Sequence, residues 1–218
     1  MKDPLDESAV FARRRRDMVE DQLVRRGIAD AAVLTSMGSV PRHAFVLERD
    51  RRQAYEDHPI PIGLGQTISQ PYVVALMSEL ARIQVGSRIL DVGTGSGYQA
   101  AVLAALGADV RTIEIVERHA TRAAGIFADL GLSIESRCGD GHAGWPEAAP
   151  FHAIVVAAAP KLVPEALLEQ LEIGGRLILP VGDIEQELLC IERNKHGWDR
   201  KRVTAVSFVP MTGGSSIH

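Results

Sequence analysis

The stretch GLGQTISQP, residues 63–71, concentrates hydrogen-bonding side chains where an ordinary loop carries only turn residues. Gln66, Thr67 and Ser69 flank the apolar Ile68, and the preceding glycines let this backbone approach another molecule closely. The composition predicts a binding segment that presents neutral hydroxyl and amide donors. A hinge or a Ser/Thr turn ahead of the next helix is the structural alternative.

These donors suit an acceptor group that is already an anion. An amine or hydroxyl acceptor needs a general base, and the sequence near this stretch has no His–Asp or Lys–Glu arrangement, His58 being the nearest histidine. A carboxylate, with a pKa of about 4, is a nucleophile at neutral pH without a base. We expect Ser69 to orient such an acceptor, because it lacks the G-x-S-x-G elbow and the partner histidine of a nucleophilic serine.

A second stretch, DVGTGSGY at residues 91–98, is a glycine loop between a predicted strand and a predicted helix. Its glycines follow G-x-G-x-G, and Tyr98 stands where a dinucleotide fingerprint has its third glycine. No Lys-Ser/Thr pair follows, so the loop is not a P-loop. Asp91 at the strand end would repel a pyrophosphate and attract cationic groups. S-adenosylmethionine, which carries a sulfonium and an amino group but no phosphate, is the cofactor that we expect.

Two more carboxylates stand at the ends of the next strands. Glu114 is placed to accept hydrogen bonds from both hydroxyls of a ribose, and Asp140, in GDG, to meet an adenine amino group. Each carboxylate also has a structural reading: Asp91 as a helix cap, Glu114 as a solvated strand end, and Asp140 as an Asp-Gly turn. Because three acidic residues stand at the ends of successive strands, a role in ligand binding is favoured over three separate structural roles.

The surrounding pattern changes near residue 88. Before it, apolar spacing predicts helices over 8–26 and 70–86, and within 28–46 a short helix capped by Asp30 and then a turn around Pro41. After it, strands and helices alternate, which predicts a doubly wound α/β domain with a mostly parallel sheet. The predicted strands are 88–93, 109–115, 133–138, 152–159 and 175–182, with helices at 97–106, 117–130 and 163–171, and 187–193 with 203–210 as a terminal antiparallel pair. We expect one domain over 1–218, with 1–86 as a helical segment carrying the substrate loop and 87–218 as the cofactor-binding core.

The composition and charge of the chain indicate which classes of partner and which compartment to expect. The chain has 218 residues and a net charge of −4, which gives no general attraction to nucleic acid. Neither a signal peptide nor a membrane span is expected, nor an obligate partner or a metal site, and we predict a cytoplasmic protein. Cys138 and Cys190 are expected to be buried free thiols, and Arg13–Arg16 a solvated helix face paired with nearby acids.

The motifs GLGQTISQP, LDVGTGSGYQAAVLA, GDGHAGWPEAAPF and AAAPKLVPEALLEQLEIGGRLILPVG, in this order, closely resemble those of the protein-L-isoaspartate O-methyltransferases. MVEDQLVRRGI, VPRHAFV and FVPMTGG are similar as well, so the resemblance covers about residues 17–213. It implies a Rossmann-like methyltransferase fold and methyl transfer from S-adenosylmethionine to the free α-carboxylate of isoaspartyl residues in damaged proteins and peptides. The ester would then close to a succinimide that reopens partly as normal aspartate.

The resemblance also implies roles for individual residues. Ser69 would be the active-site residue, with Gln66, Thr67 and Ile68 in the same substrate-binding wall. The cofactor contacts would come from Tyr72, Asp91, Gly93, Thr94, Gly95, Ser96, Gly97, Glu114, Asp140, Gly141 and Thr212.

Other functions stay open at this point. A nicotinamide-dependent oxidoreductase could use the same fold, although Tyr98 argues against it. A non-catalytic binder of the cofactor or of damaged peptides would share these motifs. A methyltransferase for small molecules or RNA is a third candidate, against which the net charge and the absence of an Asn-Pro-Pro-aromatic signature both speak.

Overall fold

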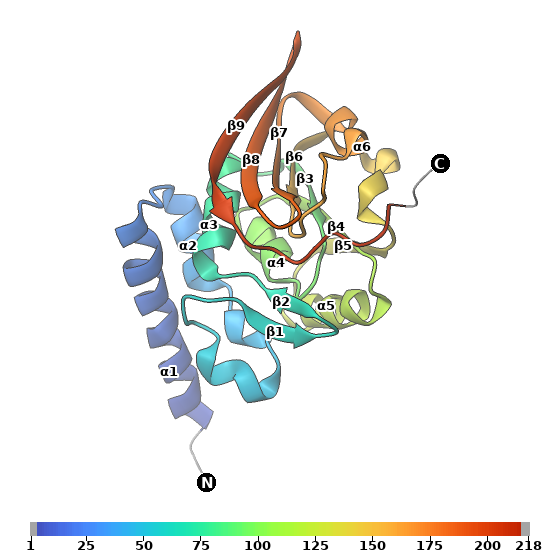
Figure 1. Ribbon diagram of the computed structural model, residues 1–218. Helices are drawn as coiled ribbons and strands as arrows, with labels where there is room; N and C mark the ends of the chain where they lie inside the picture. Colours follow the sequence, from blue (N-terminus) through green and yellow to red (C-terminus); the bar gives the residue numbers. More distant parts are fainter. Residues whose placement is uncertain (1–3, 215–218) are drawn as a thin grey trace.

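A seven-stranded sheet forms the centre of the computed structural model, which describes residues 4–214 (Figure 1). The strands are β3 (Arg88–Val92), β4 (Asp109–Glu114), β5 (Ile134–Cys138), β6 (Phe151–Val156), β7 (Leu171–Gly182), β8 (Gln186–Asn194) and β9 (Gly197–Val206). Their order is β5-β4-β3-β6-β7-β8-β9; β3 to β7 run parallel, and β8 and β9 are antiparallel. The doubly wound, mostly parallel sheet with an antiparallel C-terminal pair is therefore confirmed.

Helices cover both faces of this sheet. They are α1 (Pro4–Asp17), α2 (Ala31–Ser39), α3 (Pro71–Leu80), α4 (Tyr98–Ala105), α5 (Glu117–Asp129) and α6 (Glu165–Glu169). Alternation along β3 separates two hydrophobic cores, because successive side chains of a strand point to opposite faces. Ile89 packs in the core that includes α2 to α5, whereas Leu90 and Val92 pack in the core that includes α6.

The N-terminal segment contains the expected helices in shortened form. One continuous helix was expected over 8–26, but α1 gives way to a π-helix over Met18–Leu23 and a 3₁₀ turn over Val24–Arg26, and Gly27 ends it in the left-handed conformation. Asp30 caps α2 as predicted, accepting hydrogen bonds from the backbone of Ala32 and Val33. Further short turns of 3₁₀-helix cover Arg42–Ala44, Glu48–Gln53, Gly141–Ala143 and Pro146–Ala148.

The stretch at 63–71 is a hairpin rather than a plain loop. Strand β1 (Ile60–Gly63) pairs antiparallel with β2 (Gln66–Ile68), and the two-residue turn between them has positive φ at both Leu64 and Gly65. That is the backbone of a type I′ turn, which suits the twist of a hairpin but rarely accepts leucine. The hairpin places Ile68 inward and Thr67 outward on one short strand.

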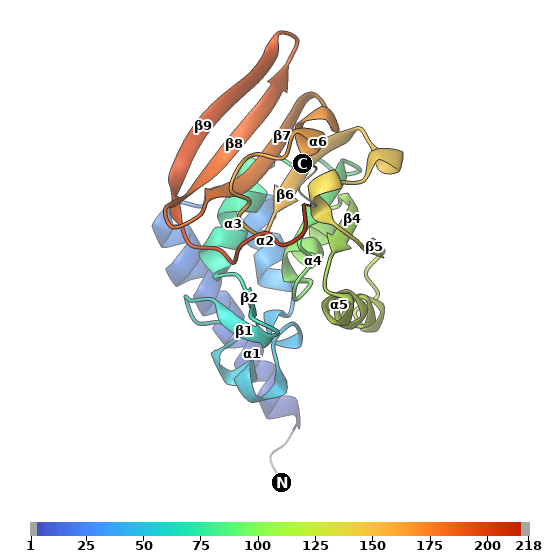
Figure 2. The same ribbon diagram turned by 45° about the vertical axis from the view of Figure 1, so that its right-hand side comes forward.

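The last strand lies earlier in the chain than predicted. Residues 203–210 alternate like a strand, but β9 ends at Val206 because it pairs with β8 from Gly197 onward. Residues after Val206 leave the sheet and pass across the ends of the parallel strands, where Met211 and Ala159 share a backbone hydrogen bond. Figure 2 shows the β8–β9 hairpin projecting from the body of the molecule.

Two smaller expectations were wrong in part, because Cys138 is not buried and only Arg13 and Arg16 of the arginine run are exposed. Both cysteines are free, but only Cys190 is buried, and Cys138 at the end of β5 is exposed. In the arginine run, Arg14 donates to the carbonyl of Arg52 and Arg15 donates to that of Gly38, so these two side chains fix α1 to the protein rather than pairing with acids. Among residues 4–214 no helix has the length and apolar character needed to cross a membrane.

Candidate active site at the ends of the parallel strands

A cleft lies at the carboxyl ends of β3, β4 and β6, where open α/β sheets bind ligands. The space between its walls is about 750 Å³ when the open mouth is included. The cleft brings together two segments that are separate in the sequence: residues 66–69, called the acceptor segment below, and the glycine loop. The predicted residues that line it are Gln66, Thr67, Ile68, Ser69, Gly93, Thr94, Gly95, Ser96, Glu114, Gly141 and Thr212.

The glycine loop crosses from β3 to α4 with positive φ at Gly93, Gly95 and Gly97. Gly97 does not line the cleft. A Cβ atom there would lie 2.8 Å from the ring of Phe127 on α5, so this glycine is needed for packing between the loop and the helix. The first two glycines face the cleft and the third sets the position of the loop.

Glu114, at the end of β4, holds the glycine loop through its carboxylate. One oxygen accepts from the backbone N–H of Gly95 at 2.7 Å and the other from that of Val116 at 2.9 Å. The side chain is 7% exposed and lines the cleft. A carboxylate oxygen can accept more than one hydrogen bond, so a ligand hydroxyl can still bind it.

Asp91 is fully buried beneath the loop and does not line the cleft. Its Oδ2 accepts from the hydroxyl of Thr112 at 2.7 Å, and that hydroxyl lies 2.5 Å from the hydroxyl of Thr94, which does line the cleft. Its Oδ1 is buried without a hydrogen-bond partner. Burial raises the pKa of Asp91 to about 7, the hydrogen bond from Thr112 opposing the rise and the charge of Glu114 adding to it. A cationic group of a ligand would favour the ionised form.

The acceptor side of the cleft offers hydroxyl groups that the protein does not use. Ser69 is half-buried and Thr67 exposed, and neither hydroxyl has a hydrogen-bond partner in the part of the chain that the structure describes. Ile68 between them is buried in the hydrophobic core. The segment is therefore anchored by one apolar side chain and presents two free donors, which fits the orientation of an anionic oxygen.

Arg42 fixes this segment from below. Its Nη2 donates to the carbonyl of Ser69 at 2.7 Å and its Nε to the carbonyl of Ala54 at 2.6 Å, while the guanidinium lies 4.8 Å from the ring centroid of Tyr98. The side chain is completely buried, and burial lowers the pKa of Arg42 to about 10, so it stays charged at neutral pH. One side chain thus joins the acceptor segment to the first residue of α4.

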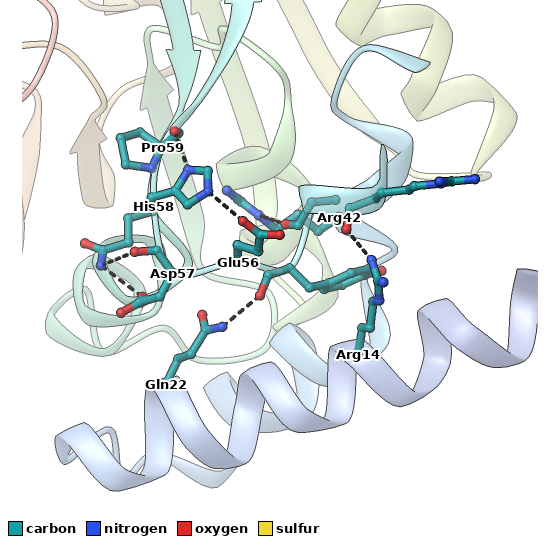
Figure 3. Close-up of polar contacts among 11 residues, drawn as sticks. Arg14, Gln22, Arg42, Glu56, Asp57, His58 and Pro59 are labelled. Carbon is teal, nitrogen blue, oxygen red and sulfur yellow. Dashed lines mark hydrogen bonds and ion pairs between the residues drawn. The ribbon is translucent and has the colours of Figure 1, made fainter. Parts of the chain in front are cut away.

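The turn that follows Ala54 is held by its own contacts, which Figure 3 shows together with Arg42. Gln22 donates to the carbonyl of Tyr55, and His58 contacts Glu56 and the carbonyl of Pro59. These contacts connect the N-terminal helices to the start of the β1–β2 hairpin, and so help to fix the position of the hairpin that carries the acceptor segment.

Two other predicted residues lie outside the cleft. Asp140 accepts from the backbone of His142 and Gly214; burial alone would raise its pKa, but these hydrogen bonds outweigh burial and lower it. It therefore caps the 3₁₀ turn over Gly141–Ala143, which follows β5. Tyr72 faces a neighbouring pocket on α3 instead, beneath Arg26.

Sequence reasoning missed several residues of the cleft. Ala157 and Ala158 follow β6, and Val209 to Met211 belong to the segment after β9. The position of that segment was hidden by the misplaced last strand. Arg42 gave only one signal, a charged residue in an otherwise apolar VPRHAFV stretch, and Thr112 gave none.

A family model described as protein-L-isoaspartate(D-aspartate) O-methyltransferase matches residues 13–216. The chain belongs to this family. A protein-L-isoaspartate O-methyltransferase of Synechococcus is 50% identical over 217 residues, covering 95% of this chain and 89% of the relative. The enzyme of the same name from Gloeobacter violaceus is 52% identical over 198 residues, covering 89% and 97%.

Solved structures agree with this protein-L-isoaspartate O-methyltransferase assignment. One structure of that name superposes with a TM-score of 0.84 at 27% identity, over 91% of this chain and 66% of the longer one. A second, described as a putative member from Plasmodium falciparum in complex with S-adenosyl-L-homocysteine, gives a TM-score of 0.79 at 28% identity, over 91% and 98%. The chain is thus a methyltransferase.

Asp91 predicts a pH dependence of this methyltransferase's stability. Its pKa is about 7 in the folded chain against 3.8 as the ordinary value. Folding therefore gains from the protonated carboxyl at low pH and loses that gain as pH rises through about 7. Asp91→Asn cannot ionise, so it escapes this loss. Its free energy of unfolding minus that of the wild type, measured by urea denaturation, should therefore be more positive at pH 8 than at pH 5.5. An equal difference at both pH values would contradict the buried, neutral carboxyl.

Replacing Arg42 should lower both the free energy of unfolding and the activity toward a peptide acceptor. Arg42→Met leaves two buried carbonyls without donors, which should cost about 3 kcal/mol in the free energy of unfolding. The acceptor segment also loses its support, so kcat/KM for a peptide should fall by about ten-fold or more while cofactor affinity changes little. Arg122→Met is the control, because Arg122 donates to the carbonyls of Phe45 and Val46 away from the cleft. It should lower stability without the selective loss; equal kinetic effects in both variants would refute the role of Arg42.

Proposed function

We propose that this chain transfers a methyl group from S-adenosylmethionine to the free α-carboxylate of isoaspartyl residues in damaged proteins and peptides. The observation that carries the proposal is the pair of unused hydroxyls, Thr67 and Ser69, in the same cleft as the glycine loop. Neutral donors can orient a carboxylate without cancelling its charge. A carboxylate needs no general base, since it is ionised at neutral pH.

The residues at the strand ends fit the proposed cofactor. The loop over Gly93–Gly97 opens a helix without phosphate-binding side chains. Asp91 is buried beneath the loop and is linked through Thr112 to Thr94, which lines the cleft, so its charge when ionised would favour a cationic ligand nearby. Glu114 and the loop residues Thr94 and Ser96 would hold it. When bound, S-adenosylmethionine supplies an electrophilic methyl group on a sulfonium. A family member's complex with S-adenosyl-L-homocysteine supports this choice.

The chain's own residues contribute by positioning. Ser69 and Thr67 would donate to the acceptor carboxylate, and Arg42 holds the backbone that carries them. Apolar side chains around the cleft, among them Ile68, Val209 and Met211, limit the access of water. Holding two reactants in a productive geometry supplies several kcal/mol of a barrier, about 7 at the lower end. No group of the protein has to remove a proton.

The product leaves for a related reason. Methylation removes the negative charge that the hydroxyl donors bind, so the ester is held less strongly than the carboxylate. The ester is also the better electrophile, and the neighbouring backbone nitrogen can displace methanol to close a succinimide that opens partly to normal aspartate. Repair of isomerised aspartate is the proposed outcome.

The proposed location of the protein is the cytoplasm. The free thiols at Cys138 and Cys190 support it, because a reducing compartment keeps cysteines in this form.

Two synthetic peptides that differ only in an aspartyl or an isoaspartyl linkage test the proposal. Purified protein and labelled S-adenosylmethionine should transfer label to the isoaspartyl peptide and leave the aspartyl peptide essentially unlabelled. The label should be released as methanol in mild base, as expected for a methyl ester. Equal labelling of the two peptides, or none of either, would refute the proposed acceptor.

Ser69→Ala should separate acceptor positioning from cofactor binding. Loss of one hydrogen bond to a charged oxygen should lower kcat/KM on the isoaspartyl peptide by about ten-fold or more. Affinity for S-adenosylhomocysteine, measured by calorimetry, should stay within a few-fold. Ser133→Ala is the matched control, because Ser133 is exposed and lies before β5, away from the cleft. Unchanged turnover in Ser69→Ala would remove Ser69 from the acceptor site.

A further inference from the structure

A second pocket opens directly beside the cleft. It lies between α3, the β1–β2 hairpin and the segment around the end of β9, and its volume is about 1130 Å³ with the open mouth included. Thr67, Ser69, Ala157 and Val209 line both cavities, so the two spaces share a wall. A polypeptide whose reacting carboxylate sits at Ser69 must extend from there, and this pocket is an adjoining space for the residues beside it.

The lining of this pocket is largely apolar with a single charge. Arg26 is the one charged side chain among its lining residues within the described chain. The apolar part comes from α3, the hairpin and the chain after β9, namely Pro59, Tyr72, Val73, Leu76, Val206 and Phe208. Such a lining fits a side chain with an apolar stem and a charged end.

Arg26 is held in one place. Its guanidinium lies 3.6 Å from the ring centroid of Tyr72, and its Nη1 contacts the Oδ2 of Asp57 at 2.9 Å. Asp57 is held in turn by the side-chain amide of Gln70, at 2.9 Å from its Oδ1. A stacked and tethered arginine loses little side-chain entropy when it binds a further partner.

The contact with Asp57 leaves most of the guanidinium available. Arginine has five N–H donors, and within residues 4–214 Asp57 is the only carboxylate that pairs with this one. The Arg26 side chain is 41% exposed and lines the pocket, whereas Asp57 is not among the lining residues. The pocket therefore presents a positively charged donor group to its occupant.

We propose that this pocket is a subsite for a substrate side chain near the isoaspartyl residue, and that Arg26 makes it selective for acidic side chains. The inference rests on the proposed function. A glutamate fits best, because its methylenes can contact Leu76 and Phe208 while its carboxylate pairs with the fork of Arg26. A lysine at the same position meets a like charge.

A set of isoaspartyl peptides tests the subsite. In one parent sequence, Glu, Gln or Lys is placed singly at each of the three positions on either side of the isoaspartyl residue, and kcat/KM is measured for each. At one or more positions Glu should exceed Gln by roughly two- to five-fold, the range for a partly exposed ion pair, with Lys below Gln. The ratio should shrink in high salt, because screening weakens a pair of this kind.

Variants at the arginine decide whether the preference comes from this side chain. In Arg26→Gln the Glu-to-Gln ratio should fall to about one, and Arg26→Lys should restore part of it. Arg25→Gln is the matched control: Arg25 is the neighbouring arginine, 71% exposed, paired with Asp21 and outside the pocket lining. It should keep the wild-type ratio. Thermal unfolding confirms that each variant is folded.

The outcomes separate this subsite from the proposed function. If no isoaspartyl peptide accepts methyl, the proposed function fails. If isoaspartyl peptides are methylated but the wild type shows no preference for Glu, or Arg26→Gln keeps the wild-type ratio, the acidic subsite is refuted while the function stands. A preference for apolar or cationic neighbours would equally overturn it.

Discussion

The two hydrogen bonds from the buried guanidinium of Arg42 are the constraint on which the acceptor side of the site depends. They hold the carbonyl of Ser69 and the carbonyl of Ala54 to one rigid planar group, and the same group lies over the ring of Tyr98 at the start of α4. An arginine suits this task, because its fork of donors can bridge two carbonyls that a single ammonium could not reach together. The acceptor segment and the glycine loop are thereby fixed to a common support.

The cofactor side is organised differently. Its carboxylates mostly serve the protein itself: Glu114 accepts from the loop backbone and Asp140 caps a turn, whereas Asp91 alone keeps an unpartnered oxygen. A ligand bound here meets a loop whose shape is already set. In the proposed reaction the neutral hydroxyls of Thr67 and Ser69 would face the anionic acceptor, and the buried Asp91 would lie beneath the cationic donor. That division of charge is what a methyl transfer to a carboxylate requires of its protein.

Much of this arrangement was predictable from the sequence, because the strand–helix rhythm and the glycine spacing are local signals. The alternation after residue 88 predicted the sheet, and the acceptor stretch and the glycine loop, both singled out by their composition, line one cleft. The failures are tertiary. Pairing with β8 decides where β9 begins and ends, a leucine in a left-handed turn concealed the hairpin, and Arg42 acts through carbonyls distant in the sequence.

The sheet arrangement makes the two halves of the site unequal in local stability. The cofactor half stands on β3, β4 and β6, each paired on both sides within the seven-stranded sheet. The acceptor half rests on a two-stranded hairpin and on the chain beyond an edge strand, which are elements with few partners of their own. Local opening costs least where partners are fewest, so the acceptor half is the part of the site that opens more readily. A site built in this way can open its acceptor half to a bulky polypeptide while the cofactor half keeps its structure.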